Sequence, residues 1–331
     1  MRAAVMTDDG VRVGDVAAPA PAAGEVLLRV ETVGVNQLDL NVIAGAGPGA
    51  AARLPRTLGL DPAGTVAAVG AGVDANLIGS EVVAKPNIPC GHCRWCGEHR
   101  ESECPAQEVL GVHRDGGACE AVAVPLSVVF PRHGLPAATA TAAVHSVPIV
   151  LNAFDAADVR VGERVLVTGA GGVLGRVALD IGRHLGTSVT AASRHPVPDL
   201  PAGVREIVTG PTSDLAGAVT PSDRFDVVID TSGSAALLAQ AVALLGWCGR
   251  AVFCAASVDA DLHVDAHAFY LQRRRLVGVA SATFDQVTRG LELVRQGAVH
   301  VPIAQRFPLD DIHSAYAAFA APRHGKVIID V

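Results

Sequence analysis

The sequence predicts an α/β protein built from two domains, one of which contains a doubly wound parallel sheet. Two observations predict this class. The chain has 331 residues, more than a usual single domain, and 50% of them are apolar, which is enough for a core in each domain. From residue 163 onward, short apolar runs alternate with helical patterns and glycine-rich turns, which is typical of parallel strands joined by helices.

The strongest part of that pattern starts at residue 163. A β-branched run at 163–169 predicts a buried strand, and a second strand is expected at 188–193. The helix between them has apolar residues at four-residue spacing, at Val173, Val177, Ile181 and Leu185. The turn before it carries glycines spaced G-x-x-G-x-x-G, and amides at such a helix N-terminus hold a dinucleotide pyrophosphate. The pattern predicts a Rossmann-type cofactor site, with a purely structural glycine turn as the alternative. Its expected residues are Gly169, Gly171, Gly172, Val173, Leu174 and Gly175.

The residues at the end of the second strand indicate which dinucleotide binds. A site that prefers NAD usually has an acid there, about 20 residues after the glycines, which bonds the ribose 2′-hydroxyl. This chain has Ser193 and Arg194 instead, followed by His195. Because a guanidinium pairs with phosphate through two hydrogen bonds, these residues favour NADPH, unless Arg194 is simply a solvated surface arginine.

Two more strands fit the same sheet, at 225–230 and 249–254, with a helix at 235–245 between them. The carboxyl ends of parallel strands face the ligand crevice in such sheets. Thr231, Ser232 and Gly233 are therefore expected as further cofactor contacts, although a simple turn explains them equally well.

Four of the seven cysteines lie close together, spaced C-x2-C-x2-C-x7-C. Four thiolates suit tetrahedral zinc, and a site with all four positions filled leaves none for water or substrate. A redox or disulfide cluster is the weaker alternative in a cytosolic chain. We therefore expect one structural Zn²⁺ per chain in a polar lobe at about 88–106, held by Cys90, Cys93, Cys96 and Cys104.

Composition bears on partners and location. The formal net charge is -7, which argues against a nucleic-acid partner, because such proteins carry basic patches. The first ten residues lack a basic segment followed by an apolar run, so we expect a cytoplasmic protein. The stretch 134–154 has no Asp, Glu, Lys or Arg but is mostly Ala, Thr, Val and Pro, and it predicts a buried helix rather than a membrane span.

Together these motifs resemble the medium-chain dehydrogenase/reductase superfamily, which includes zinc alcohol dehydrogenases and quinone oxidoreductases. The resemblance covers nearly the whole chain and rests on the four-cysteine lobe, the glycine turn and the segments 21–30, 33–39, 58–64 and 325–329. It implies a GroES-like β-barrel catalytic domain at 1–135 and 279–331, and a Rossmann domain at 136–278. It also implies an active site in the interdomain cleft and a homodimer or homotetramer.

The chain departs from the zinc alcohol dehydrogenases of this superfamily at their second, catalytic zinc. Matched by motif, the first Cys ligand corresponds to Asn36, the His ligand to Leu60 and the nearby Glu to Asp61, while the second Cys falls near His145. Leucine cannot coordinate a metal and asparagine is a poor zinc ligand, so a catalytic zinc is not expected.

Without that zinc, a simple ketone lacks its main electrophile, whereas a conjugated acceptor needs only hydrogen bonds and a proton. We therefore expect an NADPH-dependent reductase that acts on an activated C=C bond or quinone of a small molecule. In this interpretation Asn36 donates to the substrate or the nicotinamide ribose, or else caps a helix. His145 supplies a proton, or is a satisfied core histidine. Asp61 has a catalytic role, or is a buried acid paired with an arginine.

The sequence also supports two local expectations and two alternative functions. His113 is expected to be exposed on a loop, and Pro148 to end or kink the helix that contains His145. One alternative function is a zinc-dependent alcohol dehydrogenase, which two zinc ions per chain would support. The other is a non-redox protein, such as a cyclase or binding module, that keeps the cofactor as structure.

Overall fold

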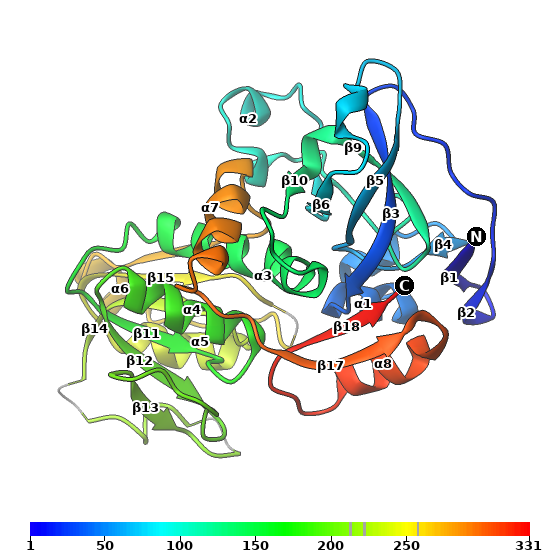
Figure 1. Cartoon of the computed structure of the whole chain (residues 1–331). Coiled ribbons are helices and arrows are strands. Elements are labelled where there is room, and N and C mark those ends of the chain that lie inside the picture. The colour runs from blue at the N-terminus through cyan, green and yellow to red at the C-terminus, as the bar shows by residue number, and fades with distance from the viewer. Residues whose placement is uncertain (212–213, 221–222, 257) are drawn as a thin grey trace. The chain divides into compact units, whose positions relative to one another are not determined.

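The computed structural model describes residues 1–211, 214–220, 223–256 and 258–331 (Figure 1). The chain divides into two compact units. The first contains Met1–His145, Thr283–Arg295 and Pro302–Val331, and the second contains Ser146–Ala282 and Gln296–Val301. The first segment of the first unit ends at His145, inside a helix, whereas the sequence suggested a boundary at 135. Residues 296–301 join the second unit, although the sequence placed them in the catalytic domain.

A seven-stranded sheet forms the frame of the first unit. Its strands follow in the order β10 (Val129–Pro131), β6 (Glu81–Ala84), β5 (Ala63–Val69), β3 (Glu25–Gly34), β18 (Lys326–Asp330) and β17 (Ile303–Pro308), and β9 (Ala121–Pro125) also pairs with β3. The pairing of β17 with β18 is parallel and the other pairings in this sheet are antiparallel. Two small sheets accompany it, β2 (Gly10–Asp15), β1 (Arg2–Thr7) and β4 (Arg56–Thr57), and β7 (Asn87–Ile88) with β8 (Glu108–Val109).

Strand β3 shows why these residues form a half-buried sheet. Val26, Leu28 and Val30 alternate along it and are buried in the core, as the two-residue period of a strand requires. The C-terminal end of β3 pairs with the C-terminal strand β18, so that Ile328 lies opposite Gly34. This register brings the end of the chain beside the residues that follow β3.

The helices of the first unit are short. They are α1 (Gln37–Ala44), α2 (Arg94–Gly97), α7 (Phe284–Arg295) and α8 (Ile312–Ala320), with single 3-10 turns η1 (Gly47–Ala51), η2 (Ala75–Leu77), η3 (Glu101–Glu103), η4 (Leu126–Val128) and η5 (Leu309–Asp311). Ile312, Ala315 and Tyr316 of α8 pack into the same apolar cluster as Val42 of α1.

Helix α3 (Ala137–Ala156) crosses the boundary between the units. Of the two effects expected of Pro148, an end or a kink, the end is contradicted, because α3 continues through it to Ala156. A proline at this position removes only one backbone hydrogen bond, the one that would reach the carbonyl of Val144, and the packing of the helix offsets that loss. By length and composition α3 could cross a membrane, but 78% of its most apolar window is buried within the protein. It is a core helix, as the sequence predicted.

The second unit contains a six-stranded parallel sheet. The spatial order is β13 (Arg205–Val208), β12 (Ser188–Ser193), β11 (Arg164–Thr168), β14 (Phe225–Asp230), β15 (Leu245–Phe253) and β16 (Arg275–Gly278). In chain order this is 3-2-1-4-5-6, the order of a doubly wound dinucleotide-binding sheet, whose strand order reverses between β11 and β14. Its helices are α4 (Val173–His184), α5 (Ala235–Ala243) and α6 (Ala266–Leu271). The strands expected at 188–193 and 225–230 are confirmed, whereas β15 begins at Leu245, earlier than expected.

Candidate functional site

The glycine-rich turn lies at the point where the strand order reverses. Gly169 follows β11 with a φ of 72°, and a Cβ on it would come within 2.8 Å of Ser232 Cα. A Cβ on Gly175 would lie 2.2 Å from the Gly169 carbonyl oxygen, so the first turn of α4 packs tightly onto the loop. A Cβ on Gly171, in contrast, would meet nothing closer than 3.9 Å. The turn is thus close-packed beneath and open above Gly171, as a loop that receives a pyrophosphate must be.

Helix α4 begins at this turn, with Gly172 as its N-cap. Because the first amides of a helix have no intrahelical acceptor, those of Val173, Leu174 and Gly175 are available to an anion. The loop after β14 lies against the same turn, where Thr231 Oγ1 donates to the Thr168 carbonyl oxygen at 2.8 Å. Asp230, buried at the end of β14, holds this loop by accepting from Thr168 Oγ1 and from Ser232 Oγ at 2.5 and 2.7 Å. Burial raises the pKa of this carboxyl group.

The candidate residues for the ribose lie at the end of β12. The register of the parallel strands places this end beside Thr168 at the end of β11. Ser193 donates a hydrogen bond from its hydroxyl to the carbonyl oxygen of His195. Arg194 is exposed, and a guanidinium in water at this edge suits a phosphate on the ribose better than a hydroxyl. The residues that the sequence suggested for the cofactor thus lie on three neighbouring strand ends of one sheet.

The four clustered cysteines surround a single point in the first unit. Their sulfur atoms all lie within 4.8 Å of one another. The Sγ atoms of Cys93 and Cys96 are 3.5 Å apart, and those of Cys90 and Cys96 are 4.0 Å apart. Zn–S bonds of about 2.3 Å in a tetrahedron give S···S edges of about 3.8 Å, so the sulfur positions fit zinc. Among the described residues, this is the one group of three or more His, Cys, Asp or Glu side chains close enough to hold a metal.

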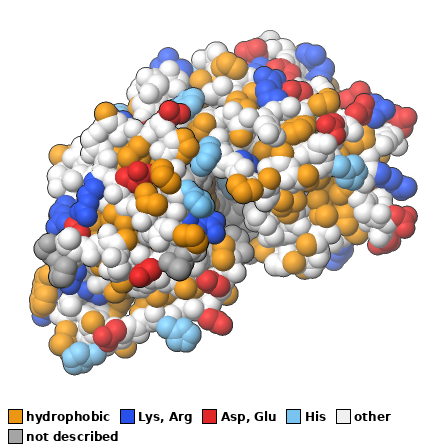
Figure 2. Space-filling view, turned by 90° about the horizontal axis from the view of Figure 1, so that it is seen from below, with side chains coloured by type: hydrophobic (Ala, Val, Ile, Leu, Met, Phe, Trp, Pro, Cys, Tyr) orange, Lys and Arg blue, Asp and Glu red, His pale blue; other side chains and the backbone are white. Residues whose placement is uncertain are grey.

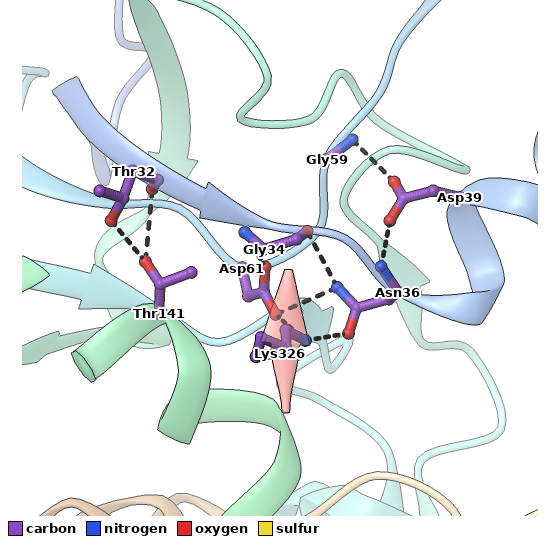
Figure 3. Close-up of polar contacts among 8 residues, drawn as sticks. All are labelled: Thr32, Gly34, Asn36, Asp39, Gly59, Asp61, Thr141 and Lys326. Atoms are coloured by element: carbon purple, nitrogen blue, oxygen red, sulfur yellow. Dashed lines mark hydrogen bonds and ion pairs between the residues drawn. The ribbon is translucent and has the colours of Figure 1, made fainter. Parts of the chain in front are cut away.

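A buried cluster of three polar side chains occupies the region after β3 (Figure 3). Lys326, at the start of β18, donates from Nζ to Oδ2 of Asp61 at 3.0 Å and to Oδ1 of Asn36. Asn36 donates from Nδ2 to the same carboxylate oxygen at 3.1 Å and to the Gly34 carbonyl at 3.2 Å. The other oxygen of Asp61 accepts from the Gly34 amide at 2.8 Å. We call Asn36, Asp61 and Lys326 the lysine cluster.

The lysine cluster is deeply removed from water. Asp61 is 0% exposed, Lys326 5% and Asn36 7%. Such a buried pair of opposite charges is tolerable because hydrogen bonds satisfy the carboxylate on both oxygens. Asp61 lies in the loop before β5, and its partner is Lys326 rather than the arginine that the sequence suggested.

Gly34 makes room for this arrangement. A Cβ at that position would lie 2.5 Å from Cε of Lys326 and 2.8 Å from Oδ1 of Asp61. Real Cβ atoms essentially never come this close to other atoms, so a larger residue at this position would displace the side chain of Lys326 or Asp61.

Asn36 also occupies the N-cap position of helix α1, although its side chain makes no capping hydrogen bond. Its amide donates to Oδ2 of Asp39, and Gly59 donates its amide to Oδ1 of the same carboxyl group, at 2.8 and 3.0 Å. Burial and the nearby negative charge of Asp61 outweigh these hydrogen bonds and raise the pKa of Asp39 to about 7. The Asn36 side chain, however, is turned to the lysine cluster, with both of its Nδ2 hydrogens engaged there.

His145 lies on α3 and is half-buried. Its Nδ1 atom is inaccessible to water and has no hydrogen-bond partner among the described residues. Burial, together with the positive charge of Lys326, lowers the pKa of His145 to about 4. The ring is therefore neutral at pH 7. His113 is exposed, as expected.

Sequence reasoning missed Lys326 and the role of Gly34, although both stand in segments that carried the resemblance. One signal was present. Only two of the 26 basic residues are lysines, Lys85 and Lys326, and both side chains are buried. In a chain that uses arginine on its surface, a lysine marks a place where the smaller cation is required.

Comparisons with known proteins agree with this architecture. The family model of the alcohol dehydrogenase GroES-like domain matches residues 22–136, and that of zinc-binding dehydrogenase matches residues 202–329. L-threonine 3-dehydrogenase of Saccharopolyspora erythraea is 28% identical over 100% of this chain and 99% of its own. Acryloyl-coenzyme A reductase of Metallosphaera sedula is 27% identical over 97% and 96% of the two chains.

Solved structures give the same result. The structure of an NAD-dependent alcohol dehydrogenase is similar with a TM-score of 0.90 and 27% identity, over 100% of both chains. That of a zinc-binding dehydrogenase from Sinorhizobium meliloti bound to NADP has a TM-score of 0.88 and 25% identity, over 100% of this chain and 99% of the other. The chain therefore belongs to the medium-chain dehydrogenase/reductase superfamily of oxidoreductases, with the GroES-like and Rossmann domains that the sequence predicted.

Proposed function

We propose that this protein is an NADPH-dependent reductase that transfers hydride to an activated C=C bond or a quinone without a catalytic zinc. The observation that carries the proposal is the lysine cluster. At the positions that the resemblance assigns to catalytic-zinc ligands stand Asn36, whose amide is fully engaged, and Leu60, which is 1% exposed and has no donor atom. The adjacent carboxylate, Asp61, is bound to an ammonium group.

The chemistry follows from what these groups offer. When bound, the nicotinamide supplies the hydride. Hydride addition to a conjugated acceptor builds negative charge on the acceptor's oxygen, and hydrogen-bond donors in a water-poor site stabilise that charge. Because His145 is neutral at pH 7, we assign the proton that completes the reaction to solvent, with the His145 ring as a hydrogen-bonding group.

The cofactor assignment rests on the second unit. The glycine turn and the free amides of α4 would hold the pyrophosphate, with Thr231, Ser232 and Gly233 beside it. Ser193 and Arg194 would hold the 2′-phosphate of NADPH. We assign one structural Zn²⁺ to the cysteine lobe. The four thiolates would fill all of its coordination positions, so the ion would take no part in the reaction.

A direct assay tests the proposal. Purified protein is mixed with NADPH and a panel of enals, enones and quinones, and the loss of NADPH absorbance is followed. We expect turnover of at least one acceptor class, and product analysis should show a saturated carbonyl or a hydroquinone. If NADPH binds tightly and no member of the panel is reduced, the third function, a non-redox protein that keeps the cofactor as structure, replaces this one.

The second candidate is a zinc-dependent alcohol dehydrogenase. It is favoured by the names of relatives, since L-threonine 3-dehydrogenase and an NAD-dependent alcohol dehydrogenase are among the similar proteins. Oxidation of secondary alcohols with NAD, lost on chelation and restored by zinc, would support it over enone reduction. The similarity to acryloyl-coenzyme A reductase favours the first candidate instead.

We further propose a cytoplasmic homodimer or homotetramer that acts on small molecules. On the face drawn in Figure 2, acidic and basic side chains of the described residues are interspersed, an arrangement that suits a small substrate better than a polyanion. Trp247, Tyr270 and Leu271 are exposed near the edge strand β16, and Arg273 stacks on Trp247 at 4.8 Å. An apolar edge of this kind suits pairing with a second copy. Native mass spectrometry should show two or four chains, and Trp247→Glu should shift the mass toward a single chain.

A further inference from the structure

In the lysine cluster, the ammonium group of Lys326 has one hydrogen without an acceptor among the described residues. Asp61 accepts one bond on Oδ1 and two on Oδ2, and Asn36 uses its oxygen and both amide hydrogens. Lys326 has three ammonium hydrogens and only two acceptors among the described residues, Asn36 and Asp61. The polar atoms of Asn36 and Asp61, which the sequence favoured for chemistry, are thus engaged in hydrogen bonds. Lys326, which they hold, keeps one hydrogen for a further acceptor.

Several features fix the position of this ammonium group. The β3–β18 register delivers Lys326 to the cluster, and the missing Cβ of Gly34 lets its side chain pass. Two acceptors from separate segments then hold Nζ. A cation on a flexible four-carbon chain is oriented this closely only when its surroundings determine it, and a preorganised donor is what stabilises a developing anion best.

The charge on Lys326 also reaches the ring of His145. His145 Nδ1 lacks a partner among the described residues, and Lys326 is one of the charges that keep this ring neutral. The donor and the neutral ring therefore belong to one electrostatic environment within the first unit.

We propose that Lys326 is a catalytic residue, whose ammonium group donates its remaining hydrogen to the oxygen of the conjugated acceptor and so takes the role that a metal ion has in the zinc enzymes. This inference rests on the proposed function. The hydride and its electron pair form a new C–H bond at the β-carbon, and the π electrons of the C=C bond move to the Cα–carbonyl bond. The carbonyl π pair moves onto the oxygen, which Lys326 stabilises as an enolate. NADPH becomes NADP⁺, and the enolate takes a proton from solvent at Cα.

The test uses acceptors that differ in how much they need this stabilisation. Cyclohexenone represents weakly activated enones, and benzoquinone represents acceptors that take hydride readily. In Lys326→Met we expect kcat for the enone to fall by about 100-fold, as for loss of one oxyanion donor, and kcat for the quinone to fall by less than about 10-fold. The dissociation constant of NADPH should stay within about threefold of wild type.

A second pair of variants guards against misfolding. Lys326→Met leaves the carboxylate of Asp61 buried without its counter-ion, so the double variant Lys326→Met/Asp61→Asn removes both charges together. Lys85→Met is the matched control, because it removes the other buried lysine of the chain, whose Nζ donates to the carbonyl oxygen of Asn87 at 2.9 Å. The control should keep the wild-type ratio of enone to quinone rates, and the double variant should lose it.

The outcomes separate the two proposals. If wild-type protein reduces neither acceptor, the proposed function fails. If wild-type protein reduces the enone, and the Lys326 variants lower kcat for the enone and for the quinone by the same factor, Lys326 is structural and the inference is wrong. A loss confined to NADPH affinity, with kcat unchanged, would make Lys326 a cofactor contact and would also overturn the inference.

Discussion

Nζ of Lys326 lies 3.0 Å from Oδ2 of Asp61, although the two residues are 265 positions apart in the chain. Both side chains are almost wholly buried, so this ion pair lies in the interior of the first unit. It fills the region in which the zinc enzymes of the superfamily are expected to hold their catalytic metal.

Gly34→Ala should disturb the pair directly. The added methyl group would meet Lys326 Cε at 2.5 Å and Asp61 Oδ1 at 2.8 Å, so strand or side chains must move. We expect a loss of about 1–3 kcal/mol in the free energy of unfolding, measured by urea titration, with a loss of turnover. Gly14→Ala is the matched control, since a Cβ there meets nothing within 4 Å. Equal stability of the two variants would contradict the close packing described at Gly34.

The metal content should be one zinc per chain, measured by plasma mass spectrometry on protein purified without chelators. Cys93→Ser should lower this value and the melting temperature, because metal binding supplies on the order of 10 kcal/mol to fold such a lobe. Cys248→Ser removes an exposed cysteine outside the cluster and should change neither. Two zinc ions per wild-type chain would instead favour the alcohol dehydrogenase candidate.

Arg194→Ala should weaken NADPH binding by about 10- to 100-fold, the usual value of a charge-assisted hydrogen bond, and leave NADH binding unchanged. Fluorescence titration of the bound nicotinamide measures both constants. Arg183→Ala, another exposed arginine of the same unit, serves as the control and should affect neither cofactor. Unchanged NADPH affinity in Arg194→Ala would reject the assignment of this residue to the 2′-phosphate.

His145 should make folding sensitive to acid. Its pKa is about 4 in the folded chain, below its ordinary value of 6.5, so the unfolded chain takes up the proton first as the pH falls. The folded state should therefore lose stability between about pH 7 and 4, by at most about 3 kcal/mol, from 1.36 kcal/mol per pKa unit. His145→Leu should lose less stability than wild type over this range, as measured by urea unfolding at each pH.

Asp39 acts in the opposite direction and must be separated from His145. Its folded pKa of about 7 lies above its ordinary value, so the folded chain gains stability as the pH falls through 7. Wild type and His145→Leu both keep Asp39, and the difference between their curves removes its contribution. Parallel curves for the two proteins would contradict the low pKa of His145.

Much of the second unit follows from local sequence. The β-branched runs at 188–193 and 225–230 form strands at those residues, and the glycine spacing marks the turn at the point where the strand order reverses. The four-cysteine spacing likewise predicted a group of sulfur atoms around one point. In each case the residues that interact are near one another in the chain, so their spacing carries the geometry.

The buried chemistry of the first unit could not be read in this way. Asn36, Asp61 and Lys326 come from three separate segments, and the motif match drew attention to the first two for roles in which their polar atoms would be free. The motif match did not identify Lys326 as the residue that binds both of them. Nor did the sequence show that α3 continues through Pro148, because that depends on packing along the whole helix.

The sequence by itself determined the superfamily, the nucleotide turn and the cysteine lobe, since each depends on short-range spacing that local backbone geometry converts into structure. Only the tertiary structure decided where the positive charge of Lys326 lies. That position depends on the antiparallel register of β18 on β3 and on the space beside Gly34, and neither is encoded within a single segment.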